Sequence, residues 1–135
     1  EKWVKWLCLM DTLTHRLVVP QTVSQALAGL SAPALELLRS KRVGDEITLW
    51  GLASTTLDPQ LAEAEAKGAA PVDRNALLRI DGVVEGLGMF EVSPYSEEQE
   101  LILPLLSRLR VTQISPGPPL ELHCEYLGSQ MANDF

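Results

Sequence analysis

The sequence divides into a first half with helical periodicity and a second half of short apolar runs between turn residues, and this division restricts the fold most strongly. Up to Gly68, apolar residues in several segments recur at the i, i+3, i+4 spacing of amphipathic helices. From Ala76 onward the apolar runs are short and are separated by prolines and glycines. Such segregation is typical of α+β folds with antiparallel sheets, and not of doubly wound parallel sheets. The length of 135 residues predicts one domain over residues 1–135.

The same periodicities predict the individual elements. Pro20 is expected to end the first strand, whereas Asp58 and Pro59 suit the N-cap and first position of the last helix. The first helix carries an apolar stripe that is predicted to pack into the core, formed by Trp3, Trp6, Leu7, Met10 and Leu13. Helices are expected at residues 1–13, 22–30, 33–41 and 59–67, and strands at 17–19, 47–52, 76–80, 88–92, 100–103, 108–114 and 120–127.

The chain is acidic, with a formal net charge of −7 and a pI of about 4.7. This charge argues against nucleic acid as the main partner, because a phosphate backbone requires a basic face. No apolar run reaches the roughly 18–20 residues that span a bilayer, and the N-terminal residues do not form a signal peptide. The chain is therefore expected to be soluble, in either the cytosol or a secreted compartment. Its first residues resemble a fragment boundary, so a longer parent protein is expected.

The cysteines and histidines do not predict a metal site. His15 and His123 are isolated in the sequence, and Cys8 and Cys124 lack the short spacing of metal ligands. Two interpretations of the cysteines remain open. They are either two free thiols or one disulfide that ties the N-terminal helix to the last strand.

A carboxylate pair precedes one of the predicted strands. Alternate residues of an extended chain point to the same face, so Glu98 and Glu100 are expected to project together, with Gln99 on the other side. Two carboxylates on one face raise each other's pKa, and such pairs are common in active sites. An acidic turn before a strand is also a common solvated loop, so the spacing alone leaves both interpretations open.

The surrounding residues resemble the signature of the mono-ADP-ribosyltransferase family. In that family a serine, a short loop and Glu-x-Glu precede an apolar strand that ends in proline, and a Ser-Thr-Ser strand lies upstream. The matching residues here are Trp50-Gly51, Ser54-Thr55-Thr56, Ser93, Tyr95, Glu98-Gln99-Glu100 and Leu101-Ile102-Leu103-Pro104. Their order and spacing agree with the family, and the resemblance covers residues 14–127.

This resemblance implies a fold and an activity. The fold has two packed, mostly antiparallel sheets, with the helices from the N-terminal half. The activity is transfer of ADP-ribose from NAD to a protein acceptor with release of nicotinamide, without a metal. Glu100 would stabilise the oxocarbenium-like transition state, and Glu98 would orient an arginine acceptor. Tyr95, in the loop before the pair, would meet the acceptor or serve as a turn aromatic packed on the sheet. Ser54 and Thr55 belong to the strand that binds NAD, in which Ser54 would brace Glu100 and Thr55 would keep the strand rigid.

Two departures from the family pattern leave an alternative open. The family holds the NAD phosphates with an arginine, usually followed by glycine, and this chain has no Arg-Gly. Two alignments are open. In one, Arg16 aligns with that arginine. In the other, Pro20-Gln21 occupies the position of the motif, and the arginine is lost. The helix after Ser54-Thr55-Thr56 also lacks the frequent phenylalanine, for which Phe90 or Tyr95 could substitute. The alternative is a catalytically inactive domain of the same fold that serves as a protein-interaction module.

Overall fold

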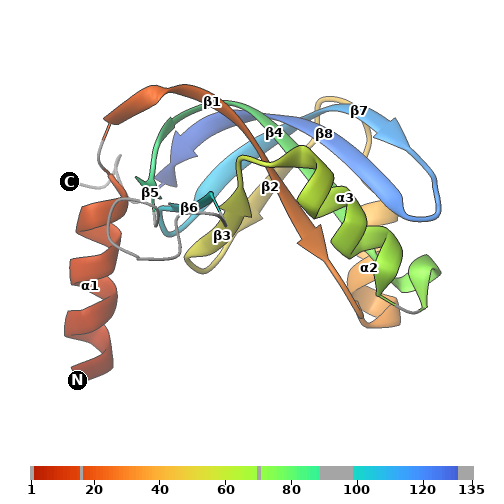
Figure 1. Cartoon of the computed structure of the whole chain (residues 1–135), viewed down its shortest axis with the longest axis horizontal. Helices are drawn as coiled ribbons and strands as arrows, with labels where there is room; N and C mark the ends of the chain where they lie inside the picture. The colour runs from red at the N-terminus through yellow and green to blue at the C-terminus, as the bar shows by residue number, and fades with distance from the viewer. Residues whose placement is uncertain (1, 16, 70, 89–98, 131–135) are drawn as a thin grey trace.

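The computed structural model describes residues 2–15, 17–69, 71–88 and 99–130. Figure 1 shows a curved sheet with α2 and α3 at one end and α1 at the other. The elements are α1 (Lys2–Thr14), β1 (Leu17–Leu27), α2 (Ala32–Arg39), β2 (Glu46–Leu49), β3 (Ala53–Thr56), α3 (Pro59–Gly68), the 3-10 helix η1 (Val72–Arg74), β4 (Ala76–Glu85), β5 (Leu87–Gly88), β6 (Glu100–Leu103), β7 (Ser107–Ser115) and β8 (Leu120–Ser129). None of the helices in these ranges is long and apolar enough to cross a membrane.

The strands confirm the predicted α+β class, with one difference in how the sheets are joined. Eight strands form a continuous sheet in the order β2-β7-β8-β4-β1-β3-β6-β5, in which only β4 and β8 are parallel. The family resemblance implies two packed sheets, but one registered pair, Ser24 with Thr56, joins β1 to β3. The two predicted sheets are therefore two parts of one sheet that share this narrow connection.

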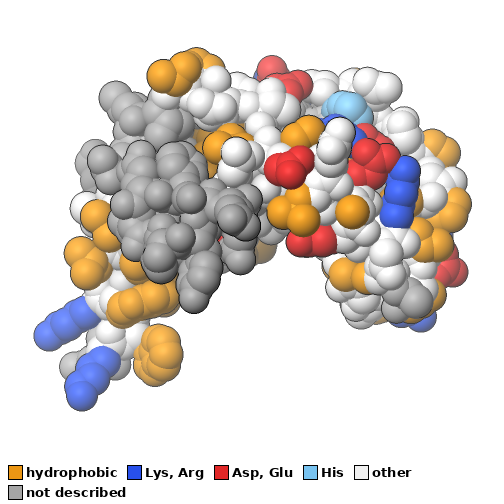
Figure 2. All heavy atoms as spheres, viewed as in Figure 1, with side chains coloured by type: hydrophobic (Ala, Val, Ile, Leu, Met, Phe, Trp, Pro, Cys, Tyr) orange, Lys and Arg blue, Asp and Glu red, His pale blue; other side chains and the backbone are white. Residues whose placement is uncertain are grey.

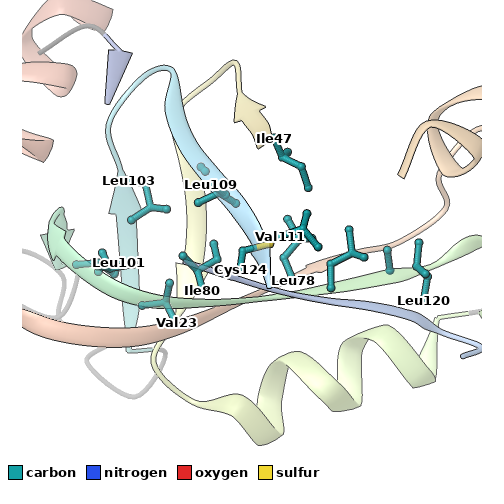
Figure 3. Close-up of a cluster of buried hydrophobic side chains, with 14 of the residues drawn as sticks. Val23, Ile47, Leu78, Ile80, Leu101, Leu103, Leu109, Val111, Leu120 and Cys124 are labelled. Carbon is teal, nitrogen blue, oxygen red and sulfur yellow. The ribbon is translucent and has the colours of Figure 1, made fainter. Parts of the chain in front are cut away.

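One hydrophobic core lies between the two parts of the sheet. Leu101 and Leu103 of β6 belong to the same buried cluster as Leu109 of β7 and Ile80 of β4. Figure 3 shows these side chains converging from strands far apart in the sheet order, with α3 on the opposite face of the sheet. The sheet curves because its two ends bury apolar side chains against each other.

The predicted helix at residues 22–30 is wrong, because residues 22–27 belong to strand β1. Residues 23–27 pair in antiparallel register with β4, from Val23 with Ile80 to Leu27 with Ala76. Pro20 does not end the strand, since it lies in the irregular stretch between the Leu17 and Gln21 pairs, where the missing N–H costs no ladder bond. Pairing with strands distant in sequence outweighs the local helical spacing.

The predicted core position of the α1 stripe is also wrong. Trp3 is 76% exposed and Trp6 is 50% exposed, and their rings pack on each other edge to face with centroids 6.3 Å apart. The buried residues of α1 are instead Asp11 and Thr14, near its C-terminal end. Figure 1 shows the reason: α1 extends away from the sheet and approaches it only at that end.

A polar network attaches the end of α1 to the sheet. One carboxylate oxygen of Asp11 accepts a hydrogen bond from the backbone N–H of Leu105 at 2.8 Å, and the other lies 3.1 Å from His15 Nε2. His15 Nδ1 lies 3.1 Å from Glu85, which also accepts a hydrogen bond from the Tyr126 hydroxyl at 2.7 Å. Burial, together with the hydrogen bond to Glu85, raises the pKa of Tyr126. These bonds fix the point at which the chain enters β1.

Helix α3 begins where the sequence predicts and covers the outer face of the sheet. Asp58 is the N-cap, and its Oδ1 accepts hydrogen bonds from the backbone N–H groups of Gln60 and Leu61 at 3.0 and 3.4 Å. Ala62 and Ala66 are fully buried and form a small apolar cluster with Leu77 of β4. Small side chains on this face let the helix lie close to the strands.

The Asp58 cap gives a first testable prediction. Asp58→Ala removes the acceptor for two helix N–H groups and is expected to lower the free energy of unfolding by about 1 kcal/mol. Urea denaturation of the two proteins measures this difference. Asp58→Ser restores a capping oxygen and should remain within a few tenths of a kcal/mol of wild type. Equal losses in the alanine and serine variants would show that the cap does not stabilise α3.

The two cysteines are free thiols in different environments. Cys8 is exposed on α1, whereas Cys124 is fully buried in the core on β8. Burial, with a smaller contribution from Asp81, raises the pKa of the Cys124 thiol to about 11. The sequence left open a disulfide or two free thiols, and in the structure both cysteines are free thiols.

Candidate functional site

The pairing of β3 with β6 brings the predicted serine and glutamate together. Ser54 is registered opposite Ile102, and Thr56 opposite Glu100. Ser54 and Glu100 are therefore diagonal neighbours on one face of an antiparallel pair, within reach of each other's side chains. The Ser54 hydroxyl donates a hydrogen bond to Glu100 Oε2. Two motifs separated by 46 residues thus meet in the structure.

Thr55 lies on the opposite face of β3 and holds the strand against β6. Its side chain is buried, and its hydroxyl donates a hydrogen bond to the backbone carbonyl of Leu101 at 2.7 Å. The Thr56 hydroxyl accepts a hydrogen bond from the backbone N–H of Asp58 at 3.1 Å, at the turn into α3. These bonds restrict the strand that carries Ser54.

Ser54 and Glu100 line a pocket of about 540 Å³. One wall comes from β1, a second from β3, and a third from the first turns of α3. The lining residues among those described are Ser24, Gln25, Ala26, Ser54, Thr55, Thr56, Leu61, Glu65 and Glu100. The pocket thus forms where β1 and β3 meet at the Ser24–Thr56 pair, next to the helix that follows β3.

The described lining of this pocket is acidic and lacks a cation. Two carboxylates, Glu65 and Glu100, belong to the lining, whereas none of its described residues is a lysine, arginine or aromatic residue. Figure 2 shows acidic side chains gathered around α3. Lys67, on the same helix, lies 2.5 Å from Glu63, and its hydrogen bond and charge lower the pKa of Glu63. The pocket therefore presents oxygen acceptors and hydroxyl groups to a ligand.

Three predicted site residues belong to segments outside the described ranges. Arg16, Tyr95 and Glu98 lie outside the described residues, as does Phe90. Pro20 and Gln21, the alternative match to the family's arginine, belong to β1 and are not among the pocket residues.

Gln25 and Glu65 are among the pocket residues that sequence reasoning missed. Gln25 falls in the segment predicted as a helix, so its place in the sheet was hidden. Glu65 follows Leu61 by four residues in α3, and this spacing places both on one helix face. The spacing of Leu61 and Glu65 was visible in the sequence, because a helix was expected directly after Ser54-Thr55-Thr56.

Known proteins match this chain by structure, whereas the comparisons by sequence find no match. No protein-family model matches the sequence, and no curated protein matches it. Solved structures do match. The ADP-ribosyltransferase Vis from Vibrio splendidus, in complex with agmatine, superposes with a TM-score of 0.72 at 17% identity, over 93% of this chain and 58% of Vis. The chain has the ADP-ribosyltransferase fold.

Other structures with the ADP-ribosyltransferase fold agree with this result. Plx2a from Paenibacillus larvae matches with a TM-score of 0.63 at 17% identity, over 92% of this chain and 70% of Plx2a. Exoenzyme S from Pseudomonas aeruginosa, bound to Carba-NAD and in complex with human 14-3-3 protein beta, matches with a TM-score of 0.66 at 14% identity. That match covers 96% of this chain and 63% of Exoenzyme S. The chain thus spans less than two thirds of the Vis and Exoenzyme S structures.

Proposed function

We propose that this chain is a mono-ADP-ribosyltransferase domain that transfers ADP-ribose from NAD to arginine on a protein acceptor and releases nicotinamide. The observation that carries the proposal is the hydrogen bond between Ser54 and Glu100 at the edge of the pocket. It joins the two motifs that resemble the family signature, on a chain with the ADP-ribosyltransferase fold. Residues 1–135 would form the single transferase-like domain of a longer protein.

In this proposal Glu100 acts on the bond between nicotinamide and ribose. As the bond between the ribose C1′ and the pyridinium nitrogen breaks, its electron pair leaves with nicotinamide and positive charge develops on the ribose. A fixed carboxylate stabilises that charge more than it stabilises the ground state. Ser54 would hold Glu100 in place, and Thr55 would keep their strand rigid. An acceptor guanidinium nitrogen then forms a bond to C1′ and loses a proton.

The remaining roles belong to residues outside the described part of the chain. Glu98 would orient the guanidinium group and receive its proton, and Tyr95 would contact the acceptor. Arg16 would bind the NAD phosphates, since a bidentate guanidinium suits that task. The agmatine complex of Vis and the Carba-NAD complex of Exoenzyme S support these two ligand classes by analogy.

The decisive experiment measures nicotinamide release from NAD by the purified domain, with and without agmatine as a guanidinium acceptor. We expect release that rises on addition of agmatine, together with ADP-ribosylated agmatine detected by mass spectrometry. Release that does not respond to agmatine, and that yields free ADP-ribose, would instead indicate an NAD hydrolase.

A second candidate function is a catalytically inactive interaction module with the same fold. It is favoured by the lack of lysine and arginine among the described pocket residues, because NAD carries two phosphates. Absence of both nicotinamide release and NAD binding in calorimetry would contradict the transferase and favour this module.

A further inference from the structure

His15 lies between two carboxylates, one at each nitrogen of its ring. Its Nε2 lies 3.1 Å from Asp11 Oδ2, and its Nδ1 lies 3.1 Å from Glu85 Oε2. The side chains are largely shielded from water, with exposed fractions of 24% for His15, 12% for Asp11 and 14% for Glu85. Each carboxylate is also held by its other oxygen, since Asp11 accepts from the backbone N–H of Leu105 and Glu85 accepts from the Tyr126 hydroxyl. Neither carboxylate can therefore turn away from the ring without loss of a second hydrogen bond.

Only a doubly protonated ring can donate to both carboxylates. A neutral imidazole has one N–H and one nitrogen lone pair, whereas the imidazolium ion has two N–H groups. In the neutral ring, one nitrogen would turn its lone pair toward a carboxylate oxygen 3.1 Å away, and two acceptors cannot share a hydrogen bond. The two negative charges also favour a cation between them. The contacts on both sides of the ring therefore select the imidazolium form.

The charged groups around His15 come from three elements. Asp11 lies on the same helix, Glu85 lies on β4, and Tyr126 of β8 reaches Glu85 through its hydroxyl. Burial raises the pKa of Tyr126, so this hydroxyl remains protonated in the range where histidine titrates. Within the described ranges, no lysine or arginine is paired with Asp11 or Glu85. Among the described residues, His15 thus supplies the positive charge for both carboxylates.

This network lies where α1 meets the sheet. The helix approaches the sheet only at its C-terminal end (Figure 1), and its buried residues are Asp11 and Thr14. The Thr14 hydroxyl donates to the backbone carbonyl of Asp11, within the helix itself, so it does not bond to the sheet. A helix of 13 residues is marginally stable in water without tertiary contacts. Loss of the contacts made by Asp11 and His15 should therefore let α1 open.

We propose that Asp11, His15 and Glu85 form a proton-dependent latch that holds α1 against the sheet while His15 carries both ring protons. When the ring loses one proton, one of the two carboxylates loses its donor and faces a lone pair instead. Because the attached state requires both protons, attachment is strongest below the range in which histidine ordinarily titrates and weakens as the pH rises through it. The latch does not involve NAD, so it stands or fails independently of the proposed function.

Hydrogen–deuterium exchange of residues 1–135 tests the latch at about pH 5.5 and about pH 8.5, on either side of the ordinary titration range of histidine. Between these values the protection factors of the α1 amides should fall by roughly fivefold, as expected for loss of one partly buried, charged hydrogen bond. His15→Gln has no titrating ring, so its α1 should be equally protected at both values. His123→Gln is the matched control, because His123 contacts a carboxylate through one nitrogen only, Nε2 with Glu121 at 3.0 Å. It should keep the pH dependence of the wild type.

Glu85→Gln separates the proton from the packing. The amide that replaces this carboxylate can donate an N–H to a ring nitrogen that has no proton, while its oxygen still accepts from Tyr126. A neutral His15 then donates its single N–H to Asp11, and both sides of the ring are satisfied. At about pH 8.5, α1 should therefore be better protected in Glu85→Gln than in the wild type.

The two variants give opposite expected changes at high pH, so the outcomes are distinct. The latch is supported if the pH dependence disappears in His15→Gln, persists in His123→Gln, and α1 regains protection in Glu85→Gln. It is overturned if His15→Gln and the wild type show the same pH dependence. Should His15→Gln fail to fold, Glu85→Gln decides alone, and protection no better than that of the wild type at high pH overturns the latch.

Discussion

Glu100→Gln is expected to lower the rate of nicotinamide release by at least about 100-fold. The substitution removes the negative charge that would stabilise the ribose cation, but an amide oxygen can still accept the hydrogen bond from Ser54. The free energy of unfolding should therefore remain within about 0.5 kcal/mol of wild type, as for other substitutions that keep packing and hydrogen bonds. Nicotinamide release and urea denaturation, measured on the same preparation, test both statements.

A carboxylate elsewhere on the sheet provides the control. Glu46 on β2 is paired with Arg108 at 3.0 Å and does not line the pocket. Glu46→Gln should leave nicotinamide release unchanged. Loss of stability in Glu100→Gln that matches its loss of activity would show that Glu100 is structural, and retained activity would remove it from the chemistry.

Asn75→Ala is expected to destabilise the protein by about 3 kcal/mol, because it would leave three backbone groups without their partner, one of them in a buried hydrogen bond. Asn75 is 1% exposed and lies between η1 and β4. Its Oδ1 accepts a hydrogen bond from the backbone N–H of Gly29 at 3.0 Å. Its Nδ2 donates to the carbonyls of Ala66 at 2.8 Å and Ala69 at 2.5 Å. One side chain thus joins the end of β1, the end of α3 and the start of β4.

Urea denaturation measures the effect of this substitution, with Gln60→Ala as the control. Gln60 is an exposed amide in the first turn of α3, so its truncation should change stability by less than about 0.5 kcal/mol. A loss in Asn75→Ala no larger than that of Gln60→Ala would show that water replaces the amide at no cost.

The elements with strong local signals were predictable. Asp58 and Pro59 begin α3 as the sequence indicates, and Glu100–Leu103 forms a strand with the predicted bounds. In the candidate site, Ser54 and Glu100 meet because β3 pairs with β6, and only the motif resemblance related these two residues before the structure did. N-caps and strand alternation depend on neighbouring residues, so a single sequence contains the information they require.

Elements that depend on distant partners were not predictable. Residues 22–27 have helical spacing, yet pairing with β4 makes them a strand. The tryptophans of α1 form an apolar stripe, yet no part of the described sheet lies against Trp3 or Trp6, which remain exposed. Amphipathic spacing states that a face is apolar, but the position of the helix relative to the sheet decides whether that face is buried.

By itself, then, the sequence determined the α+β class, the start of α3 and the bounds of the strand that begins at Glu100. Only the tertiary structure decided that β1 continues past Pro20, that Asn75 joins three elements, and that Gln25 and Glu65 share a pocket with Glu100. The physical reason is that caps and strand alternation are set by residues near in sequence. A pocket wall is set by residues that are distant in sequence, such as Gln25 and Glu65.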